Sequence, residues 1–165
     1  MYKVGELIHH ANRGLCQVEE ITSMRASASE PEKRYYKLTP LDSSGSTLFT
    51  PVDNGKVKMR RMISREEAQQ LISEFPQIHT LEIADDRKVE IACRESLTSV
   101  DCKDWVSLIK TLYERRNKRL AAGKKVAASE DRYFQSATGR LHLELGKALG
   151  IETDRVEAYI EEQLR

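Results

Sequence analysis

The residues best suited to chemistry are two adjacent histidines, His9 and His10, and a nearby thiol, Cys16. Neighbouring residues on a strand point to opposite faces, so the two imidazoles cannot converge on one metal ion without a bulge; we expect one inside and one outside. Cys16 could act as a nucleophile beside either histidine, but no third orienting group or oxyanion donor can be argued from the sequence. We therefore predict no catalytic residue among them.

The chain also lacks the motifs through which enzymes usually hold phosphate, metal or an acyl group. It has no Gly-rich phosphate loop, GxSxG, HExxH, EF-hand loop or Cys/His ligand cluster. Cys16, Cys93 and Cys102 are odd in number and far apart, so neither a disulfide framework nor a zinc site is indicated. We predict buried free thiols, no metal, no cofactor and no enzymatic activity.

A cluster of positive charge lies between residues 101 and 125. The segment carries eight basic residues against three acidic ones, a local excess of five, although the whole chain has 27 Lys+Arg and 26 Asp+Glu. It ends in Arg115-Arg116-Asn117-Lys118-Arg119, followed by Gly123-Lys124-Lys125. Cations also complement the dipole at a helix C-terminus, so both a structural role and phosphate contact stay open.

The elements that position these groups fall into two halves, and the first half is β. Short β segments at 4–9, 14–21, 34–41, 46–52 and 56–60 alternate with turns, including one from Asp42 to Gly45, as in a small antiparallel barrel or curled sheet. Asn54-Gly55 is the strongest hairpin signal, because this pair readily takes the two positive φ angles of a type I′ turn. Tyr35 and Tyr36 could stack on a base, but aromatic residues in strands usually pack, and we expect core.

After Met62 the periodicity becomes helical. Ser64 and Glu67 form a capping box at the start of a helix over 64–74, which must end before Pro76. Further helices are expected over 85–98, from Asp101 to about Gly123, from about Ser129 to Gly150, and after Thr153. The third helix carries a stripe predicted to be core: Trp105, Leu108, Ile109, Leu112 and Tyr113. We predict an α+β protein with a β domain over 1–61 and an all-α domain of about five helices over 62–165.

The chain has 165 residues and 39% hydrophobic content, enough for a real core. The opening MYKVGELIHH lacks the apolar stretch of a signal peptide, and no segment approaches the roughly 18 to 20 apolar residues that span a bilayer. We expect a cytoplasmic protein with no membrane partner.

Several motifs, in this order and spacing, resemble the CarD/CdnL family of bacterial RNA polymerase-binding regulators. The start from Tyr2 to His10, followed by Gly14 and Val18-Glu19-Glu20-Ile21, is similar to the family's start, a module shared with transcription-repair coupling factors. Two later segments resemble family strands: Tyr35-Tyr36-Lys37-Leu38 and Phe49-Thr50-Pro51-Val52-Asp53-Asn54. The helical half resembles the clostridial branch at Asp101-Cys102, Trp105 to Tyr113, Gly123-Lys124-Lys125 and Asp131-Arg132-Tyr133-Phe134.

The resemblance implies a Tudor-like β-barrel that binds the RNA polymerase β subunit through an exposed strand, and a helical domain that touches promoter DNA without sequence specificity at the upstream edge of the open bubble. It also suggests a monomer. By position, the polymerase contacts fall on Met24 or Arg25 and on Leu48, Phe49, Thr50 and Pro51. The DNA contacts would come from Arg87, Lys88, Arg94, Lys110, Arg115, Arg116, Lys118, Arg119, Lys124 and Lys125.

The sequence departs from the family pattern at two positions. Phe49 stands where many members have Arg, so a salt-bridging contact would become an apolar one. Asp86, or Glu82 with a different gap, stands where many members insert a Trp wedge into the minor groove, and an acidic residue there would repel phosphate. Two functions therefore stay open: a regulator that modulates open-complex stability through DNA, and a polymerase-binding adaptor without DNA contact.

Overall fold

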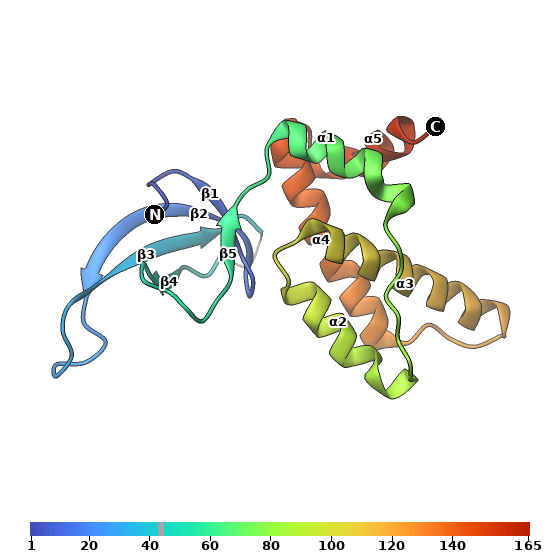
Figure 1. Cartoon of the computed structure of the whole chain (residues 1–165), viewed down its shortest axis with the longest axis horizontal. Helices are drawn as coiled ribbons and strands as arrows, with labels where there is room; N and C mark the ends of the chain where they lie inside the picture. Colours follow the sequence, from blue (N-terminus) through green and yellow to red (C-terminus); the bar gives the residue numbers. More distant parts are fainter. Residues whose placement is uncertain (43–44) are drawn as a thin grey trace. The chain divides into compact units, whose positions relative to one another are not determined.

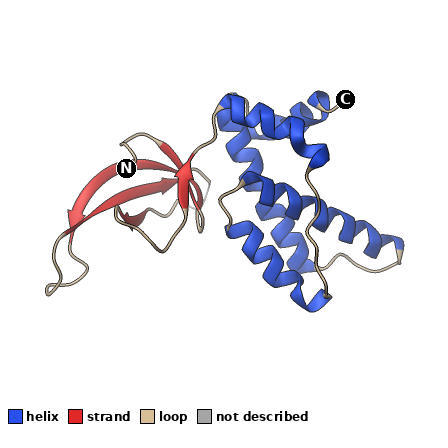
Figure 2. Cartoon of the chain, in the orientation of Figure 1, coloured by secondary structure: helices blue, strands red, loops and turns tan. Residues whose placement is uncertain are grey.

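Strands occupy the N-terminal part of the chain and helices occupy the rest (Figure 1, Figure 2). The computed structural model describes residues 1–42 and 45–165, so the predicted turn from Asp42 to Gly45 includes two positions outside the described residues. The chain divides into two compact units, Met1–Met62 and Ile63–Arg165. The expected α+β character is confirmed.

The first unit is a five-stranded antiparallel sheet in the order β4-β3-β2-β1-β5. Its strands are β1 (Leu7–His10), β2 (Gly14–Met24), β3 (Lys33–Pro40), β4 (Leu48–Pro51) and β5 (Met59–Arg61). Among the described residues β4 and β5 do not pair with each other, so the predicted barrel is not confirmed and the sheet is open.

The open sheet is strongly curled. Thr50 on β4 and His10 on β1 are separated by two strands in the sheet order, yet the Thr50 hydroxyl lies 3.5 Å from His10 Nε2. A bulge between Val18 and Glu20 in β2 contributes, because bulges bend a strand and increase its twist. The curled sheet considered alongside the barrel is therefore the architecture found.

The inner face of this sheet holds a small apolar core. Tyr36 is buried, and its hydroxyl accepts a hydrogen bond of 3.0 Å from the backbone N–H of Tyr2 while the two rings pack 5.6 Å apart. The prediction of core for Tyr36 is confirmed, and Tyr35 is half-buried. The buried members of this core are Ile8, Cys16, Val18, Tyr36 and Leu38.

The two histidines do not divide between core and solvent. His9 is 1% exposed and His10 is 4% exposed, so the expectation of one inside and one outside is wrong. Because neighbouring residues on a strand point to opposite faces, both faces of β1 are covered at these positions. His10 Nδ1 accepts the backbone N–H of Asn12 at 3.2 Å, which gives this imidazole a structural role.

The predicted type I′ hairpin at Asn54-Gly55 is also wrong. No described residue other than glycine has a positive φ, Gly55 is not among the glycines that do, and β4 and β5 do not pair. Asn54 acts through its side chain instead: Oδ1 accepts the N–H groups of Lys56 and Val57 at 3.0 and 3.1 Å, and Nδ2 donates to the Val57 carbonyl at 2.6 Å. This Asx-type turn lets the chain continue to β5, which pairs with β1.

The second unit contains five α-helices, as expected. They are α1 (Arg65–Glu74), α2 (Val89–Thr98), α3 (Cys102–Ala121), α4 (Ala128–Leu149) and α5 (Val156–Gln163), with 3₁₀ turns at Phe75–Gln77, Asp86–Lys88 and Thr153–Arg155. The capping box is confirmed, because Ser64 Oγ accepts the Glu67 N–H and Glu67 Oε1 accepts the Ser64 N–H, both at 3.1 Å. Gly150 ends α4 in the left-handed region with φ 70°.

Helices α3 and α4 take part in two apolar cores. The first joins α1, the N-terminal half of α3, the C-terminal half of α4 and α5, and the second joins α2 to the remaining halves of α3 and α4. Trp105 is fully buried in the first core and donates its indole N–H to the Ser99 carbonyl at 3.0 Å, so its predicted core position is confirmed. Tyr113 is 57% exposed, so the core prediction for it is wrong. In this part of α3 the buried residues are Leu108 and Leu112, and Tyr113 lies outside the core that they form.

Replacing Ser64 by Ala should lower the free energy of unfolding of the helical unit by about 1 kcal/mol, because the Glu67 N–H loses its acceptor. Ser64→Asp should restore most of this stability. Urea unfolding followed by fluorescence of Trp105, the single tryptophan, measures the effect in the same core that α1 joins. Ser129→Ala, at an exposed serine, is the control, and equal midpoints for Ser64→Ala and the wild type would contradict the role of the cap.

Candidate functional site

The chemically reactive side chains are buried. Cys16 is 0% exposed and its thiol donates to the Gly14 carbonyl at 3.5 Å, and Cys93 is also 0% exposed, with the pKa of its thiol raised to about 11 by burial. Cys102 is 6% exposed, so the predicted buried free thiols are confirmed. Across residues 1–42 and 45–165, no group of three or more His, Cys, Asp or Glu is arranged to hold a metal ion.

Strand β4 forms one edge of the sheet, and within the described residues no strand pairs with its outer side. Thr50 lies opposite Tyr36, and the Val52 N–H donates to the Arg34 carbonyl at 3.0 Å. Hydrogen-bonded and non-hydrogen-bonded pairs alternate in an antiparallel ladder, so the N–H and C=O of Phe49 face away from β3. The outer edge therefore offers backbone groups to an incoming strand.

Side chains along β4 alternate in the same way. Phe49 is 46% exposed, whereas Thr50 is 5% exposed and contacts His10. Leu48 is half-buried against the apolar core of the sheet, and Pro51 has no N–H to donate. Of the predicted contacts on β4, Phe49 thus presents the apolar side chain, while Thr50 faces inward.

The other predicted polymerase contacts lie elsewhere on the same sheet. Met24 ends β2 opposite Lys33, and Arg25 begins the exposed loop that follows. Phe49 lies opposite Lys37, four residues further along β3, which corresponds to about 13 Å of strand. A partner that contacts both groups has to extend along the sheet.

Three of the predicted DNA-contacting side chains are engaged within the helical unit. Lys110 donates its ammonium to the carbonyls of Phe75 and Ile78, the latter at 2.7 Å, and Arg119 Nε donates to the Lys125 carbonyl at 2.9 Å. The third, Arg115, is 24% exposed. It donates from Nε to Glu130 at 2.7 Å and from Nη1 to Asp86 at 3.2 Å.

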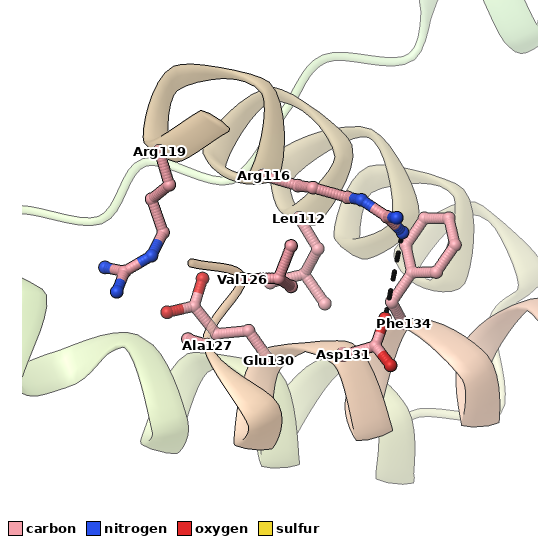
Figure 3. A pocket seen from close by; sticks show the side chains of 8 residues that line it. All are labelled: Leu112, Arg116, Arg119, Val126, Ala127, Glu130, Asp131 and Phe134. Atoms are coloured by element: carbon pink, nitrogen blue, oxygen red, sulfur yellow. Dashed lines mark ion pairs between the residues drawn. The ribbon is translucent and has the colours of Figure 1, made fainter. Parts of the chain in front are cut away.

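Arg116 also faces an acidic partner. Figure 3 shows a crevice between the end of α3 and the start of α4, in which Arg116 forms an ion pair of 3.8 Å with Asp131. Arg119 lies on the same side as Arg116, and Glu130 lies across from it. The crevice has about 10 Å³ of free volume, room for at most one water, and its charges balance, so it is no binding site.

A charge count over residues 101–125 does not include the acidic partners of Arg115 and Arg116, because Glu130 and Asp131 come later in the chain. Glu130 and Asp131 lie in the first turn of α4, where they also complement the helix dipole. Because only residues 122–127 separate α3 from α4, the first turn of α4 lies opposite the last turns of α3. The short connection around Gly123 was the signal that could have revealed these pairs.

The remaining predicted cations are accessible. Arg87 pairs with Asp85 at 2.8 Å and Arg94 pairs with Glu90 at 3.2 Å, but the two arginine side chains are 90% and 63% exposed. Hydrogen bonds from the Arg87 side chain, and then from its backbone N–H, lower the pKa of Asp85. Exposed pairs of this kind contribute little and exchange readily. Four lysine side chains are exposed with no ion pair to any described residue: Lys88, Lys118, Lys124 and Lys125.

Comparison with known proteins assigns the first unit. Residues 2–63 match the family model described as CarD-like/TRCF RID domain, which is an RNA polymerase-interacting module. No curated protein matches the chain. The match supports the resemblance of the β unit, and with it a transcription-related function involving RNA polymerase; the resemblance of the helical half to the clostridial branch stays a prediction. In the described residues no helix is both long and apolar enough to cross a membrane.

We expect none of the three thiols to react with an aromatic disulfide reagent in the folded protein at pH 8, because all are buried and the thiolate is the reactive form. All three should react after denaturation in guanidinium. Ser136→Cys, which places a thiol on an exposed position of α4, is the positive control. Rapid reaction of one native thiol would show an accessible nucleophile and would contradict the absence of thiol chemistry.

Proposed function

We propose that this protein is a transcription regulator that binds the RNA polymerase β subunit through its β unit and modulates promoter open-complex stability through DNA contacts of its helical unit. The observation that carries the first half is the CarD-like/TRCF RID match over residues 2–63, on a sheet whose edge strand exposes Phe49. The helical half of the proposal rests on the distribution of accessible positive charge.

Docking by strand addition fits the edge of β4. Backbone groups of an open edge supply affinity, and alternate side chains supply selectivity. Phe49 is the apolar group that an incoming strand would cover, and buried aromatic residues dominate many interfaces. β4 is only four residues long and ends in Pro51, which cannot donate, so the added segment should be short.

The DNA contacts we propose are electrostatic and made to phosphates. The accessible lysines Lys88, Lys118, Lys124 and Lys125 can approach a backbone without breaking an internal pair. Neither position aligned with the family's wedge is aromatic, since Asp86 and Glu82 are both acidic and exposed, and Trp105 is buried. The protein would therefore bind DNA through charge, and its affinity would depend strongly on salt concentration and little on base sequence.

An adaptor that binds polymerase without touching DNA is the second candidate. It is favoured by the partners that Arg115 and Arg116 already have in Glu130 and Asp131, which reduce the charge available to DNA. The two functions differ in one measurable property: only the regulator binds a bubble-containing promoter fragment with an affinity that falls as salt rises.

Phe49→Asp in the full chain should weaken binding to the polymerase β subunit at least ten-fold, because it places a charge in an apolar contact; burying an unpaired charge costs well over the roughly 1.4 kcal/mol that corresponds to ten-fold. The protein should stay folded, since Phe49 is half exposed. Val4→Asp makes the same change at an exposed apolar residue away from β4 and should bind normally. If Phe49→Asp unfolds the protein, or if it binds the polymerase β subunit as well as the wild type does, β4 is not the polymerase interface.

Replacing Lys118, Lys124 and Lys125 together by Gln should weaken binding of the full chain to a bubble-containing promoter fragment. It should also flatten the plot of log affinity against log salt by up to about 0.9 for each phosphate that the variant no longer neutralises. Lys147→Gln, on the C-terminal part of α4, is the matched control. If the wild-type chain binds no DNA even at low salt, the adaptor replaces the regulator.

A further inference from the structure

A positively charged concavity of the helical unit shares Arg119 with the crevice of Figure 3. It is an open hollow of about 210 Å³, formed where the 3₁₀ turn before α2 meets the end of α3 and the loop after it. Its lining residues are Asp86, Arg115, Lys118, Arg119, Ala122 and Lys124. Four of these are cations and one is an anion, so the lining alone carries a formal charge of +3.

The cations of the hollow differ in how firmly they are held. Glu130 holds Arg115 through two hydrogen bonds, from Nε at 2.7 Å and from Nη2 at 3.4 Å, which fixes the plane of the guanidinium. Arg119 is anchored by its Nε to the Lys125 carbonyl. The side chains of Lys118 and Lys124 are exposed, and their ammonium groups have no partner among the described residues. The hollow thus combines two positioned guanidinium groups with two adaptable ammonium groups.

The chain already supplies one oxyanion to this hollow. Arg115 Nη1 donates to Asp86 Oδ1 at 3.2 Å, although the Asp86 side chain is 89% exposed. A carboxylate so exposed gains little from its pair and exchanges easily with another anion. The Asp86 carboxylate therefore marks the place where an external oxyanion would meet Arg115.

The helix dipole argues against an anion here, since the hollow borders the C-terminus of α3. Three terminal carbonyls of that helix are already bonded, however. Arg119 and Leu120 accept the N–H groups of Lys124 and Gly123 at 2.8 and 3.0 Å, and Lys118 accepts the N–H of Ala122 at 3.1 Å. The four cations of the hollow exceed the carboxylates of Asp86 and Glu130 by two charges, which outweighs the remaining partial negative charge of roughly half an elementary charge.

Size and charge select the ligand. The free volume of about 210 Å³ lies below the range of about 300 Å³ and more that drug-sized molecules occupy. Guanidinium groups favour the oxygens of phosphate, with which they form paired hydrogen bonds, and lysines add charge without demanding a fixed geometry.

We propose that this hollow is a phosphate-binding site in which Asp86 occupies Arg115 until a phosphate group displaces it. The phosphate belongs either to a nucleic-acid backbone or to a free phosphate compound. The first source rests on the proposed function, because it makes the hollow one of the DNA contacts, whereas the second does not depend on it. Asp86 then acts as a built-in competitor that lowers affinity for either source.

The experiment compares Asp86→Asn with Glu90→Gln in the full chain, with pyrophosphate and bubble-containing DNA as separate probes. Both variants remove one negative charge near the start of α2, but Glu90 pairs with Arg94 outside the hollow. Asp86→Asn should tighten pyrophosphate binding about two- to five-fold, as expected for the loss of an exposed competing pair, and Glu90→Gln should change it less. Replacing both Lys118 and Lys124 by Gln should weaken it about ten-fold or more.

The outcomes separate the two sources and the two proposals. If Asp86→Asn also tightens DNA binding and pyrophosphate competes with DNA, the bound group is a backbone phosphate. If only pyrophosphate responds, the site takes free phosphate and is not one of the DNA contacts, and the salt-dependent binding of the wild-type chain to promoter DNA decides the proposed function separately. Equal effects of Asp86→Asn and Glu90→Gln on both probes, or no saturable pyrophosphate binding, would overturn the phosphate site and leave polymerase binding untouched. Fluorescence of Trp105 during melting reports whether each variant stays folded.

Discussion

Arg115 joins the end of α3 to the start of α4 through two hydrogen bonds to Glu130, and this contact shapes the charged surface around it. Its guanidinium is mostly buried, so it needs charged or polar partners, and it finds them in Glu130 from α4 and Asp86 at the start of α2. Arg116 also lies 3.8 Å from Asp131, so both arginines have an acidic partner on α4. The charge that remains outward is carried by lysines beyond them, at the end of α3 and in the loop that follows.

The structure of the first unit depends on the curl of its open sheet. Because β1 comes close enough to β4 for His10 to meet Thr50, the small core closes without a continuous ladder of strands. An unclosed sheet keeps a free edge, and such edges are templates for another strand. The edge strand β4 carries the half-exposed Phe49. The same unpaired edge that leaves the sheet open is therefore suited to binding a strand of another protein.

The two units therefore recognise partners by different physics. A sheet edge offers directed backbone hydrogen bonds and one apolar anchor, which suit a defined protein segment. Lysines around a shallow hollow attract anions over a long range and do not require a fixed hydrogen-bond geometry, which suits phosphate. In the function proposed above, the first surface would bind polymerase selectively and the second would add an electrostatic contact whose strength Asp86 limits.

Much of the secondary structure was determined by the sequence alone. The capping box at Ser64, the core position of Trp105 and the end of α4 at Gly150 all follow from local rules, because caps, apolar periodicity and left-handed glycine act within a few residues. The motifs around Tyr36 and Phe49 likewise predicted the family to which residues 2–63 are matched.

What the sequence left open depends on contacts between distant segments. Burial of both His9 and His10 requires both faces of β1 to be covered, and the side-chain turn at Asn54 accompanies the pairing of β5 with β1. The pairing of Arg115 with Glu130 likewise depends on the α3–α4 hairpin, which brings the end of one helix beside the start of the next. Tertiary structure decided these points for one physical reason: pairing order and charge compensation depend on which segments meet in space, and local residue patterns do not encode that.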